Sequence, residues 1–403
     1  MELFWLEHIK LWRKKTVKVC VALCFTYVVI IGNILIFQWF GFGSSDDYTS
    51  AFGNNFDGHT VIRGSQKYSL SFGRELTDEV LQKLVRDYQE MEASGREEEL
   101  EMTDWQIVNS WIGKLYPELK DVNNYNIMIS YVDPDDLTDL YERRRQAVEE
   151  FLEINGQAGA EKECLLQMEQ KVQKPFRYEW VEGWSTLLSS MVAELGIVMA
   201  LFLSIVLSSL FAGEWHNNTG ALVLTTRNGW GKVALAKICT GLAFTVELFA
   251  LLAVSNIISQ LFFMGTAGWN MPIQNIKLIA VAPMNMLQAE IYEYAFALLG
   301  AIGFAGIVMF ISAAVKNNVL ALLLSLAVVY GPMVIADYLP YGVQKALDLI
   351  PLVGSSTDIF RTNTFCVFGK FIWSPYLLIT VPVLIGICFL PFTIRRWSRR
   401  LKV

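Results

Sequence analysis

The chain has 403 residues, of which 53% are hydrophobic and 18% charged, with 39 acidic against 33 basic side chains. Residues 41–186 hold 29 of the acids and 15 of the bases, so an acidic segment is joined to a basic, strongly apolar remainder. An acidic chain argues against nucleic acid as a partner, and long apolar runs exclude an ordinary soluble domain.

Residues 1–16 predict a cytoplasmic amphipathic helix that lies on the membrane surface. Trp5, Ile9 and Trp12 fall on one face of such a helix, at i, i+4 and i+7. The helix would be either a plain anchor or a contact for a cytoplasmic partner. The sequence leaves both roles open.

Six runs are apolar and long enough to cross a bilayer core about 30 Å thick, which needs roughly 20 helical residues. They cover residues 17–40, 187–211, 233–264, 285–315, 319–339 and 372–393. Basic residues precede the first run, follow the last in a tail at 394–403, and occupy the second–third and fourth–fifth connections. The positive-inside rule therefore predicts a multi-pass protein of the cell membrane, embedded in its lipids, with both termini in the cytoplasm.

The predicted fold class is mainly α, with an extracytoplasmic α+β domain at residues 41–186 between the first two spans. Helical periodicity predicts helices near residues 76–91, 105–115, 134–155 and 161–173, and alternating β-forming residues predict a strand at 125–132. We expect no catalytic constellation in this domain and no metal site in the chain. Cys164 and Cys366 both lie in polar segments, and whether they pair is open.

The connection at residues 212–232 contains more features than joining two helices needs. Glu214 directly follows the second span, and residues 217–220, Asn-Asn-Thr-Gly, can turn the chain. Residues 221–226 predict a short helix along the membrane surface. A second turn at 227–229 then leads into the third span.

This pattern of Glu-x4-Thr, a short apolar helix, a basic turn and then Ala-Lys resembles the first cytoplasmic loop of permeases of the type-2 ATP-binding-cassette (ABC) transporter superfamily. In that family the loop is the coupling helix, which docks on a separate ATP-hydrolysing subunit. The resemblance assigns coupling to Glu214, Thr219, Gly220, Leu222, Leu224, Arg227 and Lys237. Two positions depart from the family pattern: Asn218 stands where Gly is frequent, and Arg227 near where Pro is frequent. Asn can replace a Gly of positive φ.

The membrane part as a whole is similar to these permeases, with six spans, cytoplasmic ends and outer helices before the last span, here at residues 340–371. The chain has no phosphate-binding loop of its own, because Thr226 stands at the first Gly position before Gly231-Lys232. The resemblance therefore implies an ABC ATP-binding subunit that binds ATP and Mg. It also implies a second permease half, identical or not, while the chain itself would be no enzyme and bind no cofactor.

Polar side chains within the spans are costly in lipid, so they usually face protein or water. The candidates for a translocation path are Glu194, Glu247, Asn256, Gln260 and Glu290. Counting about 1.5 Å per residue from the start of the third span places Glu247 near the middle of the bilayer. Each candidate has an alternative role as a hydrogen-bonding group inside the bundle.

We therefore expect the chain to be the permease half of an ATP-driven exporter. Its substrate would be amphipathic, or like a peptide or a lipid. The alternatives are an ATP-independent transporter or channel and a membrane-anchored sensor with a ligand-binding outer domain. The substrate, the direction of transport and the choice between homodimer and heterodimer stay open.

Overall fold

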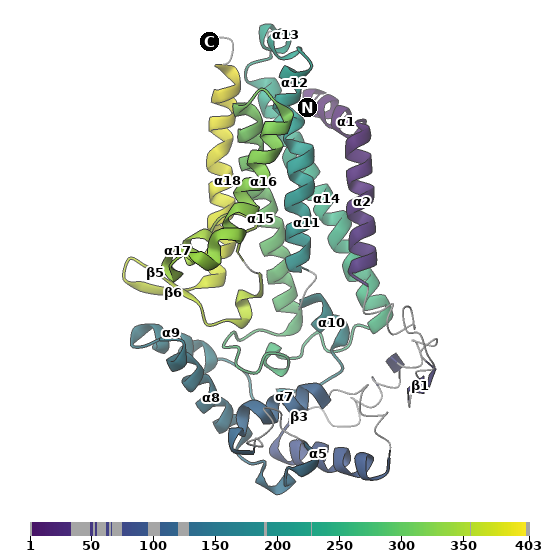
Figure 1. Cartoon of the computed structure of the whole chain (residues 1–403), viewed down its shortest axis with the longest axis vertical. Helices are drawn as coiled ribbons and strands as arrows, with labels where there is room; N and C mark the ends of the chain where they lie inside the picture. The colour runs from purple at the N-terminus through teal and green to yellow at the C-terminus, as the bar shows by residue number, and fades with distance from the viewer. Residues whose placement is uncertain are drawn as a thin grey trace.

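The computed structural model describes residues 2–33, 49–50, 53–54, 62–63, 66, 75–95, 105–119, 129–188, 192–226, 228–354 and 356–399. These residues are mostly helical, with a few short strands. Long helices form an upright bundle, and shorter helices from residues 41–186, hereafter the acidic segment, lie across one of its ends (Figure 1). The opposite end carries α1 (Glu2–Trp12), α13 (Gly220–Thr225) and the end of α18 (Figure 1).

Five helices among the described residues are long and apolar enough to cross a membrane, which is compatible with a multi-pass membrane protein. They are α11 (Val192–Leu207) continued by α12 (Ser209–His216), α14 (Lys232–Met264), α15 (Met286–Ala314), α16 (Asn318–Ile335) continued by η6 (Ala336–Tyr338), and α18 (Ser374–Ser398). They overlap the second to sixth expected runs. The first run begins as α2 (Lys15–Ile31), which packs on α11 and α14, and its residues 34–40 lie outside the described residues.

Helices α15 and α18 touch backbone to backbone. A Cβ atom on Gly303 would overlap the carbonyl oxygen of Pro382, and one on Gly306 would lie 2.5 Å from that of Gly386. Small residues permit such close approach, which maximises van der Waals contact where water supplies no driving force. The two helices are therefore held together along much of their length.

A one-residue interruption at Ser208 separates α11 from α12. The buried hydroxyl of Ser312, on α15, donates to the Ser208 carbonyl oxygen (2.6 Å) and accepts from the backbone N–H groups of Phe211 (3.0 Å) and Ala212 (3.1 Å). A side chain inserted into the hydrogen-bond ladder is a recognised cause of a break in a helix.

The described part of the acidic segment contains short helices and two pairs of two-residue strands. Its helices include α5 (Asp78–Ala93), α7 (Trp105–Leu115), η1 (Pro117–Leu119), η2 (Ile129–Tyr131), η3 (Pro134–Asp136), α8 (Leu140–Ile154), α9 (Ala160–Glu169) and α10 (Glu182–Thr186). Strand β1 (Thr49–Ser50) pairs with β2 (Gly53–Asn54), and β3 (Glu75–Leu76) with β4 (Phe176–Arg177), both antiparallel.

The strand expected at residues 125–132 is wrong over its described part, because Ile129–Tyr131 forms the 3-10 helix η2. The side chain of Gln89, on α5, donates to the carbonyl oxygens of Ile129 (3.0 Å) and Val132 (2.8 Å). A side chain thus satisfies carbonyls that a neighbouring strand would otherwise bond. Residues 125–128 lie outside the described residues.

Buried side chains of the acidic segment share one apolar core with the loop at residues 265–285, hereafter the α14–α15 loop. This shared core joins Trp111 and Val148 to Met271, Val281 and Trp373. The loop contains η5 (Ile273–Asn275), and the indole N–H of Trp111 donates to the Asn275 carbonyl oxygen (3.0 Å). The acidic segment is therefore seated on the bundle by its core.

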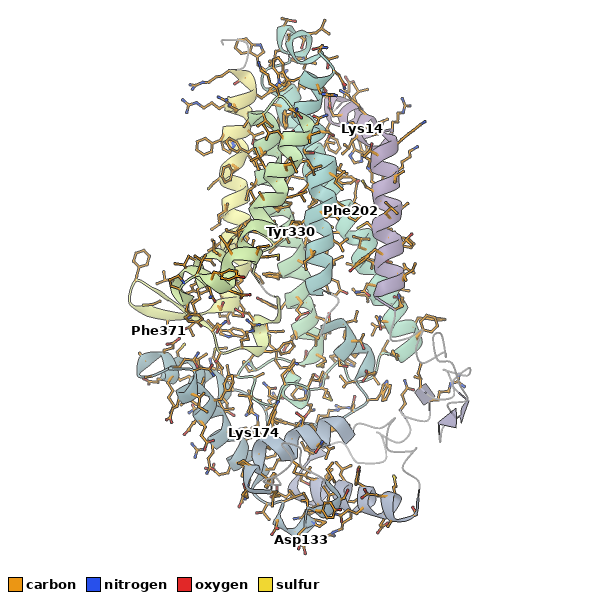
Figure 2. All side chains as sticks on the ribbon, viewed as in Figure 1. Lys14, Asp133, Lys174, Phe202, Tyr330 and Phe371 are labelled. Atoms are coloured by element: carbon orange, nitrogen blue, oxygen red, sulfur yellow. The ribbon has the colours of Figure 1, made fainter. Side chains whose placement is uncertain are left out.

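Arg144, on α8, adds polar contacts at the same joint. Its Nε donates to the carbonyl oxygen of Leu278 (2.9 Å) and its Nη2 to that of Ala280 (3.0 Å). Its Nη1 lies 2.6 Å from Oε1 of Glu169, which is also 2.9 Å from Nζ of Lys174, labelled in Figure 2. Both members of the Arg144–Glu169 pair are almost fully buried.

The resemblance predicts a helical segment at residues 340–371, and the structure shows it to be only partly helical. It contains α17 (Tyr341–Leu347) and η7 (Ser356–Phe360), followed by an antiparallel hairpin of β5 (Thr364–Val367) and β6 (Lys370–Trp373). The hairpin contacts α9, where the thiol of Cys164 lies 3.7 Å from the carbonyl oxygen of Phe371 (Figure 2). Cys164 and Cys366 are both free thiols.

Candidate functional site

The short helix expected after the second span is present as α13, from Gly220 to Thr225. Asn218 precedes it with φ of 58°, so this turn uses the left-handed conformation that Gly or Asn adopts most readily. A Cβ atom on Gly220 would lie 2.8 Å from the indole of Trp215, so the turn needs a glycine at this position.

Behind α13 lies a set of five residues that we name the Glu214 cluster: Glu7, Lys10, Glu214, Thr219 and Lys237. Glu214 is 7% exposed, and its Oε1 lies 2.6 Å from Nζ of Lys10 and 2.8 Å from Nζ of Lys237. Its Oε2 accepts from the hydroxyl of Thr219 (2.6 Å). Lys237 is 2% exposed and also lies 2.7 Å from Oε2 of Glu7. The cluster joins α1, α12, the turn before α13, and α14.

The cluster brings together three residues that the sequence pattern assigned to coupling and two that it did not. Glu214, Thr219 and Lys237 are in contact in the structure. The pairing of Lys10 and Glu7 with them could not be predicted from the sequence of the loop. The available signal was the i, i+3 spacing of Glu7 and Lys10, which puts both on one face of α1. Close by, Lys14 donates from Nζ to the Ser209 hydroxyl (3.1 Å), at the junction of α1 and α2 (Figure 2).

The other coupling candidates separate into an exposed and a buried group. Leu222 is 70% exposed, whereas Leu224 is fully buried in the core of the bundle. The following turn is bonded to α18, because the indole N–H of Trp397 donates to the Gly229 carbonyl oxygen (3.0 Å). Arg227 lies outside the described residues. Helix α13 is thus fixed on its inner side and presents Leu222 outward.

Glu247 contacts α1, not the other path candidates. Its Oε1 lies 3.2 Å from Nε2 of His8, and its Oε2 accepts from the indole N–H of Trp12 (3.0 Å). The side chain of Glu247 is 44% exposed. The structure places Glu247 against α1, which packs on α14. The side chain of Glu194 lies outside the described residues.

Asn256 and Gln260 are buried and bond within the bundle. The amide of Asn256 donates to the hydroxyl of Tyr294 on α15 (3.3 Å), and the amide of Gln260 donates to the Gly32 carbonyl oxygen, directly after α2. Each therefore ties α14 to a neighbouring segment.

Glu290 lines a groove of about 480 Å³ between α14 and α15, hereafter the α14/α15 groove. Its walls are apolar and include Phe249, Ala253, Ile291 and Trp184 of α10. Glu290 is 3% exposed, and neither of its carboxylate oxygens has a hydrogen-bond partner among the residues that the structure describes. This groove is the candidate ligand site.

Comparisons with protein-family models, with curated proteins and with solved structures each find no match. The function is therefore argued from the geometry of the chain itself.

Proposed function

We propose that the chain is the membrane permease subunit of an ATP-driven exporter, in which α13 docks on a separate ATP-binding subunit. The Glu214 cluster carries this proposal. A loop that only joins two helices needs no buried ion pairs, because burying charges is costly unless their geometry is held. Here two lysines and a hydroxyl hold one carboxylate behind a six-residue helix.

The cluster gives α13 a direct connection to the bundle. Glu214 is bonded to Lys237, in the first turns of α14, and to Lys10 of α1. A displacement of α13 by ATP binding in a partner would therefore pass to two helices through short ion pairs. Leu222 supplies the exposed apolar side chain that a docking surface needs.

The distribution of charge supports the proposed topology. Helix α1, α13 and the basic end of α18 share one end of the bundle, and the acidic segment lies at the other (Figure 1). Under the positive-inside rule the first end is cytoplasmic and the acidic segment is outside. In this proposal α2 is the first of six spans, and ATP and Mg are bound by the partner subunit.

A second permease half, identical or a sibling, completes the proposal. On α16, Val319, Leu323 and Val334 are 62%, 58% and 71% exposed, and on α2, Val19 and Leu23 are 56% and 58% exposed. The resemblance places the first and fifth spans at the seam between halves, and these apolar faces are suited to that contact.

The test is purification of the tagged full chain from its native cells in a mild detergent, followed by mass spectrometry. We expect a stoichiometric ATP-binding subunit with the wild type and at least a tenfold loss of it in Leu222→Ser. Tyr131→Ser is the control, because Tyr131 is also a large and mostly exposed side chain, at 83% against 70% for Leu222, and lies in the acidic segment. Glu214→Ala should retain the fold and lose ATP-stimulated transport.

Two results would overturn the proposal. One is a folded chain that copurifies with no ATP-binding subunit, and the other is an unchanged yield of that subunit with Leu222→Ser. In the first case the sensor interpretation is tested next, by titrating ligands against the acidic segment in the full chain. Normal transport by Glu214→Ala would remove Glu214 from the mechanism.

A further inference from the structure

The α14/α15 groove opens on the lateral surface of the bundle, between the two helices. Its rim includes Val246, Val254 and Ile291, which are 43%, 52% and 61% exposed. Its floor includes Phe249 and Ala253, which are 7% and 5% exposed. In a membrane-spanning bundle such a groove is reached from the lipid, so an apolar molecule can enter it without crossing water.

Among the described residues, no hydrogen-bond partner lies near the carboxylate of Glu290, a polar group of the groove. The other two polar lining groups are engaged, since the Trp184 indole N–H donates to the Thr266 carbonyl oxygen (3.2 Å) and the Tyr294 hydroxyl accepts from Asn256. A buried carboxylate without hydrogen bonds costs several kcal/mol. Glu293, one turn further along α15, is also buried and without a partner in the described part of the chain, which adds to that cost.

We propose that the α14/α15 groove binds a cationic amphiphile, whose ammonium head pairs with Glu290 while its hydrocarbon chain lies along the apolar walls. The ammonium supplies the missing hydrogen-bond donors and the compensating charge. The volume falls within the range of small-molecule sites, which are mostly apolar with a few placed polar groups.

Other ligand classes fit these residues less well. A divalent metal ion needs several oxygen ligands, and the groove offers a single carboxylate. An anionic or neutral lipid brings no charge to offset Glu290. As a substrate class for the exporter the inference rests on the proposed function, but binding itself requires neither ATP nor a partner subunit.

The test uses the purified full chain in phosphatidylcholine nanodiscs, without nucleotide. The probe is dodecylamine with a photoreactive diazirine at the end of its chain, and labelled peptides are identified by mass spectrometry. We expect labelling within residues 246–257 and 287–298, at least tenfold weaker in Glu290→Gln. Glu293→Gln is the matched control, because it removes a buried acid outside the groove lining and should stay within threefold of wild type.

Competition identifies the chemistry that is bound. Unlabelled dodecylamine should displace the probe, whereas dodecanol and dodecyl sulfate, with the same chain, should not. Equal labelling of wild type and Glu290→Gln, or equal competition by dodecanol, would overturn the inference. A third result would also overturn it: no labelling of the wild type, together with a disulfide crosslink between two copies of the Val254→Cys variant. The groove would then be a contact surface between two chains. If the probe does not label the groove, copurification of an ATP-binding subunit still supports the proposed function. If no such subunit copurifies, labelling of the groove still supports the binding site.

Discussion

Replacing Arg144 by alanine should loosen the joint between the acidic segment and the α14–α15 loop. The guanidinium is 1% exposed and bonds Glu169 as well as the carbonyl oxygens of Leu278 and Ala280. It also stacks over the ring of Phe176, 5.2 Å from the ring centroid. One side chain thus bonds both sides of the joint.

The free energy lost in Arg144→Ala depends on which hydrogen-bond partners the groups around Arg144 retain. Removing one member of a buried ion pair costs roughly 3–5 kcal/mol. Glu169 keeps Lys174 at 2.9 Å, and the Ala280 carbonyl keeps the amide of Gln274 at 3.0 Å. Since only the Leu278 carbonyl loses this donor outright, we expect the lower end of that range, about 3 kcal/mol.

Arg145→Ala is the matched control, one residue away on the same helix. Arg145 is 43% exposed and, among the described residues, pairs with Glu142 and Glu149 of its own helix, at i−3 and i+4. Exposed pairs of this kind contribute little to stability, so exchange in the control should stay close to that of the wild type.

The assay is hydrogen exchange of the full chain, read on peptides that cover residues 271–286 and 140–154. A loss of about 3 kcal/mol corresponds to roughly 100-fold faster exchange by opening of the joint. Equally faster exchange in Arg144→Ala and Arg145→Ala would refute the reasoning. So would faster exchange in Arg144→Ala that is confined to residues 140–154 and leaves residues 271–286 unchanged.

The same joint should depend on pH. Burial raises the pKa of Glu169, but Lys174 and Arg144 lower it by more, so the net pKa lies below the ordinary value of 4.5. A carboxyl whose pKa is lowered by folding stabilises the fold above its unfolded pKa, and this contribution is lost as pH falls through the folded pKa. Exchange of residues 271–286 should therefore rise below about pH 4 in the wild type, and less so in Glu169→Gln.

Two further variants test other parts of the structure. Gly303→Ala places a Cβ atom against Pro382 and should destabilise the bundle by about 1–3 kcal/mol, which lowers its melting temperature. Gly331→Ala is the control, because a Cβ atom there meets nothing within 4 Å, and its melting temperature should stay the same or rise. Equal shifts of the melting temperature in the two variants would contradict the close packing of α15 on α18. Burial and the charge of Asp358 raise the pKa of Asp348 to about 6, so the fold should gain stability as pH falls from 7 towards 4. Asp348→Asn should be more stable than wild type at pH 8 and lose this dependence, and an unchanged pH profile would contradict it.

The sequence predicts those elements whose signal is local. Long apolar runs fix the helices of the bundle, because only a helix satisfies its own backbone over 20 apolar residues. Helix α13 was predicted within one residue at each end, since Asn218 and the glycines on either side punctuate it clearly.

The contacts within the candidate sites depend on residues that are distant in sequence. Glu214 meets Lys10, 204 positions away, and Glu247 meets Trp12, 235 positions away. No periodicity within α14 indicates that α1 packs on it. The segment around Ile129 alternates as a strand does, but Gln89 of α5 provides the hydrogen bonds instead.

The glycine contacts between α15 and α18 link the two helices to the core beneath them. Helix α15 begins at the capping box of Asn285 and Gln288, at the end of the α14–α15 loop, and α18 begins at Ser374, whose hydroxyl donates to the buried Asp358 (2.7 Å). Both helices thus start in or beside the shared core and then run in contact through Gly303. The described part of the acidic segment packs on the same core. A binder that restrains this segment should therefore also restrain α15 and α18.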